Sequence, residues 1–153
     1  MALEGLVRPG LGLVLRGPMD RDALFDALAR SATDALPGLD QRIVVRALAE
    51  RENKGTTATR DGVAFPHAIV DDSPQLLVIP AVVSGGVRFT ATAAPAQLIF
   101  FTVGSRRDPT QHIRVLARLS RLALQPAVRD RLLGATDGAQ LVDLVLAEDR
   151  AHG

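Results

Sequence analysis

The feature that most constrains the fold is the middle of the chain, residues 62–103, where short apolar runs alternate with turn residues. Three runs, 62–65, 76–83 and 96–103, have the length and the β-branched and aromatic character of buried strands. A weaker run covers 87–92, and the turn signals DDSP and SGG separate the candidates. We therefore predict that this part of the chain forms a β-sheet.

Helical patterns flank this block on both sides. Before it, apolar residues recur at helical spacing over 20–32 and 40–52. After it, an Asp-Pro pair opens a helix over 108–124, a second proline opens a short helix at 126, and a capping Thr-Asp pair precedes a last helix ending near 148. Two helices, then strands, then helices predict a single mixed α/β domain over the whole chain, residues 1–153.

Composition excludes several functions before any motif is considered. The 153 residues include no cysteine, which removes thiolate chemistry and cysteine-based zinc sites and fits a reducing compartment. A net charge of +1 and 3% aromatic residues, without Trp or Tyr, argue against nucleic-acid binding. The longest apolar run is far shorter than the roughly 20 residues that span a bilayer, and the first residues lack the apolar core of a signal peptide. We expect a cytoplasmic protein that does not insert into a membrane.

The stretch GVAFPHA, residues 62–68, places a histidine directly after a predicted strand. Pro66 has no N–H to give to a sheet ladder, so the strand is expected to stop there, with Phe65 still extended. His67 is then expected at the mouth of the sheet, where the chain turns out of it. A histidine alone in such a place is more often structural than catalytic, so its neighbours decide its meaning.

Two further side chains are predicted to point inward. His112 lies in the first turn of its helix on the same stripe as Val115, where unpaired amides favour an anion and disfavour imidazolium. Arg51 continues the apolar stripe within 43–48, and its guanidinium suits a carboxylate or phosphate, whereas Glu52 is expected to point elsewhere. The alternative for Arg51 is that it lies beside the helix C-terminus, where a cation is favoured.

Other chemistries find little support in the sequence. The histidines and the Asp71-Asp72 pair lack the spacing of metal ligands, so we predict no metal site. Ser84 lacks the preceding glycine of a nucleophile elbow. The arginines at 114, 118 and 121 form one helix face, which we interpret as solvated or, alternatively, as a docking surface for an acidic partner.

These residues resemble a known family. The run ALAERENKGTTATRDGVAFPHA, 47–68, is similar to the signature of the IIA components of the bacterial sugar phosphotransferase system, fructose/mannitol class, including its nitrogen-regulatory branch. In that signature an Arg-Glu pair ends a helix and is followed by Ser/Thr-Thr, a Gly-apolar-Ala-apolar strand and Pro-His. The run LIFFTVGSRRDPTQHIRVLARLSRLAL, 98–124, resembles the family's buried strand and second-histidine helix. The similarity covers nearly the whole chain.

The resemblance implies both a fold and a function. The fold would be a mixed sheet of about four to five strands covered by helices on its faces. His67 would take a phosphoryl group from the small histidine phosphocarrier protein and pass it to a sugar-transporter IIB domain, or hold it as a mark for a regulated protein. Arg51 and His112 would flank His67, with Thr57 in the phosphate-binding set, and no cofactor is implied.

Two departures from the family pattern bear on this function. Ala58-Thr59-Arg60 stands where the family shows Gly-apolar-Gly, which removes easy access to positive φ. Asp71 and Asp72 stand near a position that is often basic, so we expect them to repel a phosphohistidine or an acidic donor. Two hypotheses remain: a working phosphoryl carrier or regulator, with acid-labile phosphate on His67, and a non-catalytic IIA-like interaction module that gains none.

Overall fold

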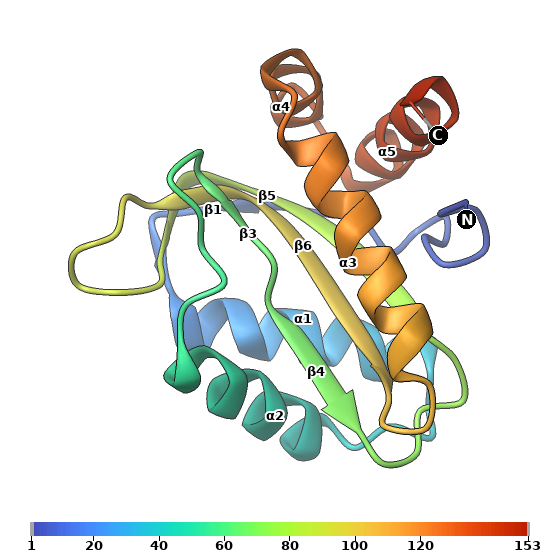
Figure 1. Ribbon diagram of the computed structural model, residues 1–153. Coiled ribbons are helices and arrows are strands. Elements are labelled where there is room, and N and C mark those ends of the chain that lie inside the picture. Colours follow the sequence, from blue (N-terminus) through green and yellow to red (C-terminus); the bar gives the residue numbers. More distant parts are fainter. Residues whose placement is uncertain (1, 153) are drawn as a thin grey trace.

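The computed structural model describes residues 2–152 (Figure 1). The helices of this part are α1 (Arg21–Ala35), α2 (Gln41–Lys54), α3 (Pro109–Ala123), α4 (Pro126–Leu133) and α5 (Gly138–His152). Asp20 and Asp40 cap α1 and α2 by accepting hydrogen bonds from first-turn amides, and prolines open α3 and α4. Each helix lies where helical periodicity and capping residues predict it.

The strands of residues 2–152 form one mixed sheet. They are β1 (Leu13–Arg16), β2 (Met19–Asp20), β3 (Val63–Ala64), β4 (His67–Val70), β5 (Leu77–Arg88) and β6 (Ala96–Ser105). The long strands β5 and β6 pair antiparallel at the centre. β1 and β2 pair in parallel with β5, while β3 and β4 pair in parallel with β6. The predicted α/β class, with a mixed sheet flanked by helices, is confirmed.

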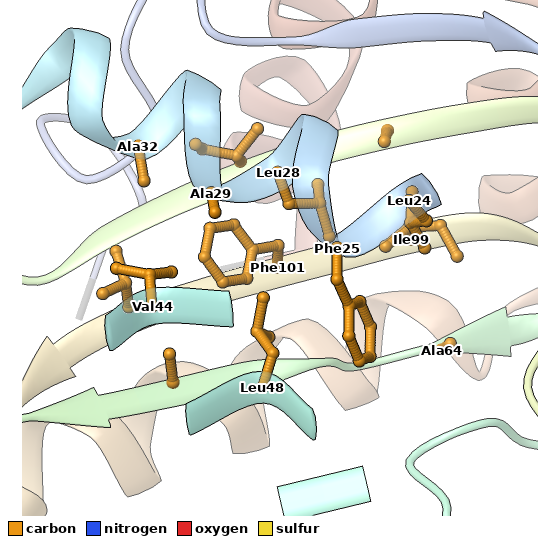
Figure 2. Packing of buried hydrophobic residues seen from close by; sticks show 14 of the residues in the cluster. Leu24, Phe25, Leu28, Ala29, Ala32, Val44, Leu48, Ala64, Ile99 and Phe101 are labelled. Carbon is orange, nitrogen blue, oxygen red and sulfur yellow. The ribbon is translucent and has the colours of Figure 1, made fainter. Parts of the chain in front are cut away.

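Helices cover both faces of the sheet (Figure 1). Because side chains alternate along a strand, β6 serves both layers. Ile99 and Phe101 belong to the core beneath α1 and α2, whereas Leu98 and Phe100 belong to the core beneath α3, α4 and α5. Figure 2 shows Ile99 and Phe101 among side chains of α1 and α2. Residue 102, the next even-numbered position of β6, therefore faces α3.

The observed strands differ from the prediction at the sheet margins. The sheet has six strands rather than four to five because short strands in the first 20 residues pair with β5, and four residues or fewer give no periodicity to detect. The weaker run 87–92 is not a separate strand, since β5 continues to Arg88 through a bulge after Val82. Gly85 and Gly86 adopt φ of 79° there, a backbone conformation that other residues rarely reach.

Candidate functional site

His67 begins β4 and lies opposite Thr102 of β6. The expectation that the chain turns out of the sheet at this point is wrong. The edge strand is interrupted only at Phe65 and Pro66, between β3 and β4. The Pro66 carbonyl still accepts a hydrogen bond from the Thr102 amide, at 3.2 Å, and keeps the chain beside β6. The Nδ1 atom of His67 lies 3.0 Å from the carbonyl oxygen of Phe65. A carbonyl can only accept, so Nδ1 carries the proton and Nε2 carries the lone pair.

His112 lies in the first turn of α3, and its predicted inward orientation is confirmed. Its side chain is 3% exposed and continues the buried stripe of Val115 and Leu119. The Nε2 atom is 2.8 Å from the hydroxyl of Thr102. Gly104 leaves room for the ring, since a Cβ there would lie 3.1 Å from Nδ1 of His112. The sheet face under α3 thus fixes His112 from two positions of one strand.

The two imidazoles lie edge to face, with ring centroids 5.5 Å apart and planes inclined at 69°. Burial, and to a smaller extent the positive charge of a protonated His67, lower the pKa of His112 to about 4. Burial also lowers the pKa of His67, with Arg51 acting in the same direction, while the bond to Phe65 and the charge of Glu52 oppose the shift. Both rings are therefore neutral at pH 7, the form in which imidazole has a lone pair to offer.

Arg51 lies beside this pair but not where its stripe predicts. The buried stripe of α2 is Val44, Leu48 and Glu52, while Arg51 lies one step around the helix. Its Nη1 donates to the carbonyl of Gly55 at 2.6 Å, the C-terminal position that was the alternative interpretation. Arg51 also lines a hollow of about 170 Å³, together with His67 and with Ala47, Glu50, Lys54, Ile69 and Arg106.

Glu52, which the sequence interpretation places away from the core, is buried at 5% exposure. Its carboxylate accepts hydrogen bonds from the Thr57 amide, at 2.9 Å, and from the Thr57 hydroxyl. The spacing from Val44 through Leu48 to Glu52 was the signal for this orientation. Both donors of Thr57 are committed to Glu52, and Thr57 does not line the hollow, so we leave Thr57 out of the phosphate-binding set proposed below.

Charges at the rim of the site are balanced in pairs. Asp71 pairs with Arg106 at 2.9 Å and Asp72 pairs with Arg107 at 3.0 Å, all four with exposed side chains. The two acids therefore do not present the net negative charge that their sequence predicts. The loop at 58–60 also closes without positive φ, since within residues 2–152 only glycines have it.

The arginine face of α3 is only partly solvated. Arg114 and Arg121 are exposed, but the Arg118 side chain is 14% exposed and pairs with the buried Asp149 of α5. Asp149 also accepts a hydrogen bond from the amide of Leu3, at 2.9 Å. Arg118 is therefore a structural residue, and the interpretation of this face as uniformly solvated is wrong.

Two searches of residues 2–152 are relevant to other functions. None of the helices in this range is both long and apolar enough to cross a membrane. The same residues contain no group of three or more histidine, aspartate or glutamate side chains placed to hold a metal ion.

The fold and the paired histidines define a class of protein. Residues 14–148 match the family model described as phosphoenolpyruvate-dependent sugar phosphotransferase system, EIIA 2. The chain belongs to this family. It is 33% identical, over 86% of its length and 85% of the relative, to the PTS system fructose-specific EIIA component of Haloferax volcanii. It is 30% identical, over 96% of its length and 95% of the relative, to the nitrogen regulatory protein of Bradyrhizobium diazoefficiens.

Solved structures show the same fold. The nitrogen regulatory protein IIA-Ntr of Neisseria meningitidis superposes with a TM-score of 0.82 at 20% identity, covering 94% of this chain and 98% of that one. The mannitol IIA enzyme of Escherichia coli, solved in complex with phosphorylated IIB, superposes with a TM-score of 0.74 at 17% identity, covering 93% and 99%. At these identities the structures establish the fold, and the shared family comes from the sequence match.

Proposed function

We propose that this protein is a phosphoryl carrier or phosphorylation-dependent regulator of the phosphotransferase system, and that the phosphoryl group enters on Nε2 of His67. The observation that carries the proposal is the 3.0 Å contact between His67 Nδ1 and the Phe65 carbonyl. It holds the proton on Nδ1 and leaves a lone pair on Nε2 of a neutral ring, and His67 lines the same hollow as Arg51.

The transfer needs no proton to leave His67. The lone pair of Nε2 forms a new N–P bond as the N–P bond of the donor breaks, and the electron pair of that bond returns to the donor nitrogen. Nδ1 keeps its proton and donates it in a hydrogen bond to the Phe65 carbonyl throughout, which stabilises the positive charge that the phosphorylated ring acquires. In this step the protein contributes position and electrostatics rather than covalent chemistry of its own.

Cationic and dipolar groups stabilise the transferred phosphoryl group. Arg51 donates one of its five N–H groups to the carbonyl of Gly55, and the other four remain for phosphoryl oxygens. Lys54 and Arg106 line the same hollow. The α3 N-terminus, which carries His112, adds a partial positive charge. These positively charged and dipolar groups suit the doubly negative phosphoryl group without a metal ion.

The proposed donor is the small histidine phosphocarrier protein, and the proposed acceptor is a IIB domain or a regulated protein, all in the cytoplasm. The structure of the Escherichia coli mannitol IIA enzyme with phosphorylated IIB supports the first kind of acceptor. The Bradyrhizobium relative, a nitrogen regulatory protein, supports the second. The paired charges of the 71–72 and 106–107 loops remove the repulsion that would disfavour an acidic partner.

The test is to incubate the protein with phosphoenolpyruvate, the general phosphotransferase enzyme and its phosphocarrier, and to measure intact mass. We expect one acid-labile phosphoryl group on the wild type, none on His67→Ala, slower labelling of His112→Ala, and wild-type labelling of the control His152→Ala. His152 lies in the last turn of α5 beside Glu148, at 3.2 Å.

A non-catalytic interaction module is the second candidate, and one observation favours it. The guanidinium of Arg51 donates to Gly55 and the hydroxyl of Thr57 donates to Glu52. Two motif residues therefore make hydrogen bonds within the protein, which leaves fewer of their donors free for a phosphoryl group. A wild-type protein that gains no mass, under conditions that label an ordinary IIA protein, would establish this alternative.

A further inference from the structure

Thr102 touches both histidine-bearing segments, although no sequence motif singles it out. It lies in the centre of β6 with 0% exposure, directly opposite His67 in the ladder. Its amide donates to the carbonyl of Pro66, the residue before His67, at 3.2 Å. Its hydroxyl lies 2.8 Å from Nε2 of His112. One residue therefore connects the backbone at the first imidazole to the ring of the second.

A hydroxyl at this place needs a reason. The run from Leu98 to Val103 is otherwise apolar and buried, and a buried hydroxyl is costly unless it is hydrogen-bonded. Valine has nearly the same shape and would fit a strand interior better. The hydroxyl of Thr102 is thus explained by the nitrogen atom that it contacts.

Counting donors and acceptors indicates the direction of this hydrogen bond. Within residues 2–152, Nδ1 of His112 has no hydrogen-bond partner. If Nε2–H donated to Thr102, the hydroxyl proton and the Nδ1 lone pair would both remain unpaired. If the hydroxyl donates to Nε2, only the Nδ1–H group is left without a partner. The second arrangement leaves fewer buried groups unsatisfied and places the His112 proton on Nδ1.

We propose that Thr102 is a positioning residue: its hydroxyl holds His112 by Nε2, fixes the Nδ1–H tautomer of that ring, and so keeps Nε2 of His112 from donating a hydrogen bond to the nucleophilic nitrogen of His67. The two rings are 5.5 Å apart, near enough for a reoriented His112 to reach its neighbour. An N–H group directed at Nε2 of His67 would occupy the lone pair that must attack phosphorus. The kinetic part of this inference rests on the proposed phosphotransfer, whereas the tautomer does not.

The test uses Thr102→Val, which removes the hydroxyl and keeps the shape, and Thr102→Ser, which keeps the hydroxyl. The control is Thr92→Val, at an exposed position beyond β5. Imidazole ¹⁵N NMR of the unphosphorylated proteins reports the tautomer of His112, and mass spectrometry reports the phosphorylation rate. We expect wild type, Thr102→Ser and Thr92→Val to show an unprotonated Nε2 on His112 and rates within about twofold of one another.

Thr102→Val is expected to shift His112 toward the Nε2–H tautomer and to slow phosphorylation about tenfold. The proposal is overturned if Thr102→Val keeps both the tautomer and the rate of wild type. It is equally overturned if Thr102→Ser behaves like Thr102→Val, because the hydroxyl would then be irrelevant. A wild type that shows the Nδ1–H tautomer but gains no phosphate would contradict the proposed function and leave the role of Thr102 in holding His112 standing.

Discussion

The proposed chemistry depends on two imidazoles that burial keeps neutral. Removing a ring from water penalises its charged form, and this effect is the largest cause of the lowered pKa of both His67 and His112. Arg51 adds a smaller contribution at His67. The same guanidinium that would bind the phosphoryl group therefore also keeps the nucleophile unprotonated.

Replacing Arg51 by Gln tests both effects of its charge. Because the positive charge of Arg51 lowers the pKa of His67, its removal should raise that pKa, measured by NMR titration. The phosphorylation rate at pH 7 should fall about a hundredfold, as when one preorganised donor is lost. Arg46→Gln, at an exposed position of the same helix, is the control and should change neither quantity. An unchanged pKa of His67 in Arg51→Gln would contradict this account of the site.

His112 predicts a pH dependence of stability. Its pKa is about 4 in the folded protein and about 6.5 when unfolded, so the unfolded chain binds more protons between these values. Stability should therefore fall as the pH drops through this window, by about 2 kcal/mol between pH 7 and pH 5 from this group alone. Urea unfolding at both pH values should show a smaller loss for His112→Gln than for wild type. Equal losses in the two proteins would contradict the buried neutral state.

At the scale of elements, the sequence predicts helices better than edge strands. The start of a helix is determined by nearby residues, as Asp20 and Asp40 show by capping α1 and α2. The strands β1 and β4 form because they pair with β5 and β6, which lie far away in the sequence, so the local sequence does not predict them. Pro66 cannot donate to a ladder, but its carbonyl accepts a hydrogen bond from Thr102, so the chain stays beside β6 and β4 begins at His67.

The site residues also divide into those that the local sequence predicts and those that depend on tertiary contacts. Helical periodicity predicts the inward orientation of His112, and the Pro-His motif predicts His67 as the nucleophile. On α2 the four-residue spacing from Val44 through Leu48 to Glu52 favours Glu52 over Arg51 as the buried residue, but the boundary of the buried stripe is set by what packs against it. Thr102 is invisible as a motif, although a polar residue inside an apolar strand is a usable signal.

The end of α2 depends on Glu52. This carboxylate accepts two hydrogen bonds from Thr57 and so folds the loop that leads from α2 to the strand before His67. Glu52→Ala should lower the free energy of unfolding by about 2 kcal/mol, because buried donors lose their acceptor. Glu50→Ala, on an exposed position of the same turn, should stay within about 0.5 kcal/mol of wild type. Similar values for the two variants in chemical denaturation would show that the Glu52 network is not structural.

At the scale of the whole molecule, the site lies where the two layers of the fold meet. Arg51 comes from α2, on the same face of the sheet as α1, and His112 comes from α3, on the other face (Figure 1). His67 lies between them on β4, at the edge of the sheet. The position of α3 is in turn set by α5 and by the N-terminal residues. Asp149 connects these three parts through Arg118 and the amide of Leu3.

Loss of Asp149 should loosen this connection. Asp149→Ala leaves the partly buried Arg118 without its partner, so we expect a loss of about 3 kcal/mol in the free energy of unfolding. Hydrogen exchange should also show reduced protection of the Leu3 amide. Asp143→Ala, on the exposed side of α5, should change stability by less than about 0.5 kcal/mol. A stable Asp149→Ala protein with a protected Leu3 amide would mean that the N-terminal segment is held by apolar packing alone.

The central claim is that Nε2 of His67 receives the phosphoryl group while Nδ1 keeps its proton and donates it to the Phe65 carbonyl in a hydrogen bond. The most direct measurement is ¹⁵N NMR of the phosphorylated protein with phosphorus coupling resolved on the imidazole nitrogens. The account predicts coupling to phosphorus at Nε2 of His67 and a protonated Nδ1 on the same ring. Phosphorus on Nδ1, or on another residue, would contradict it.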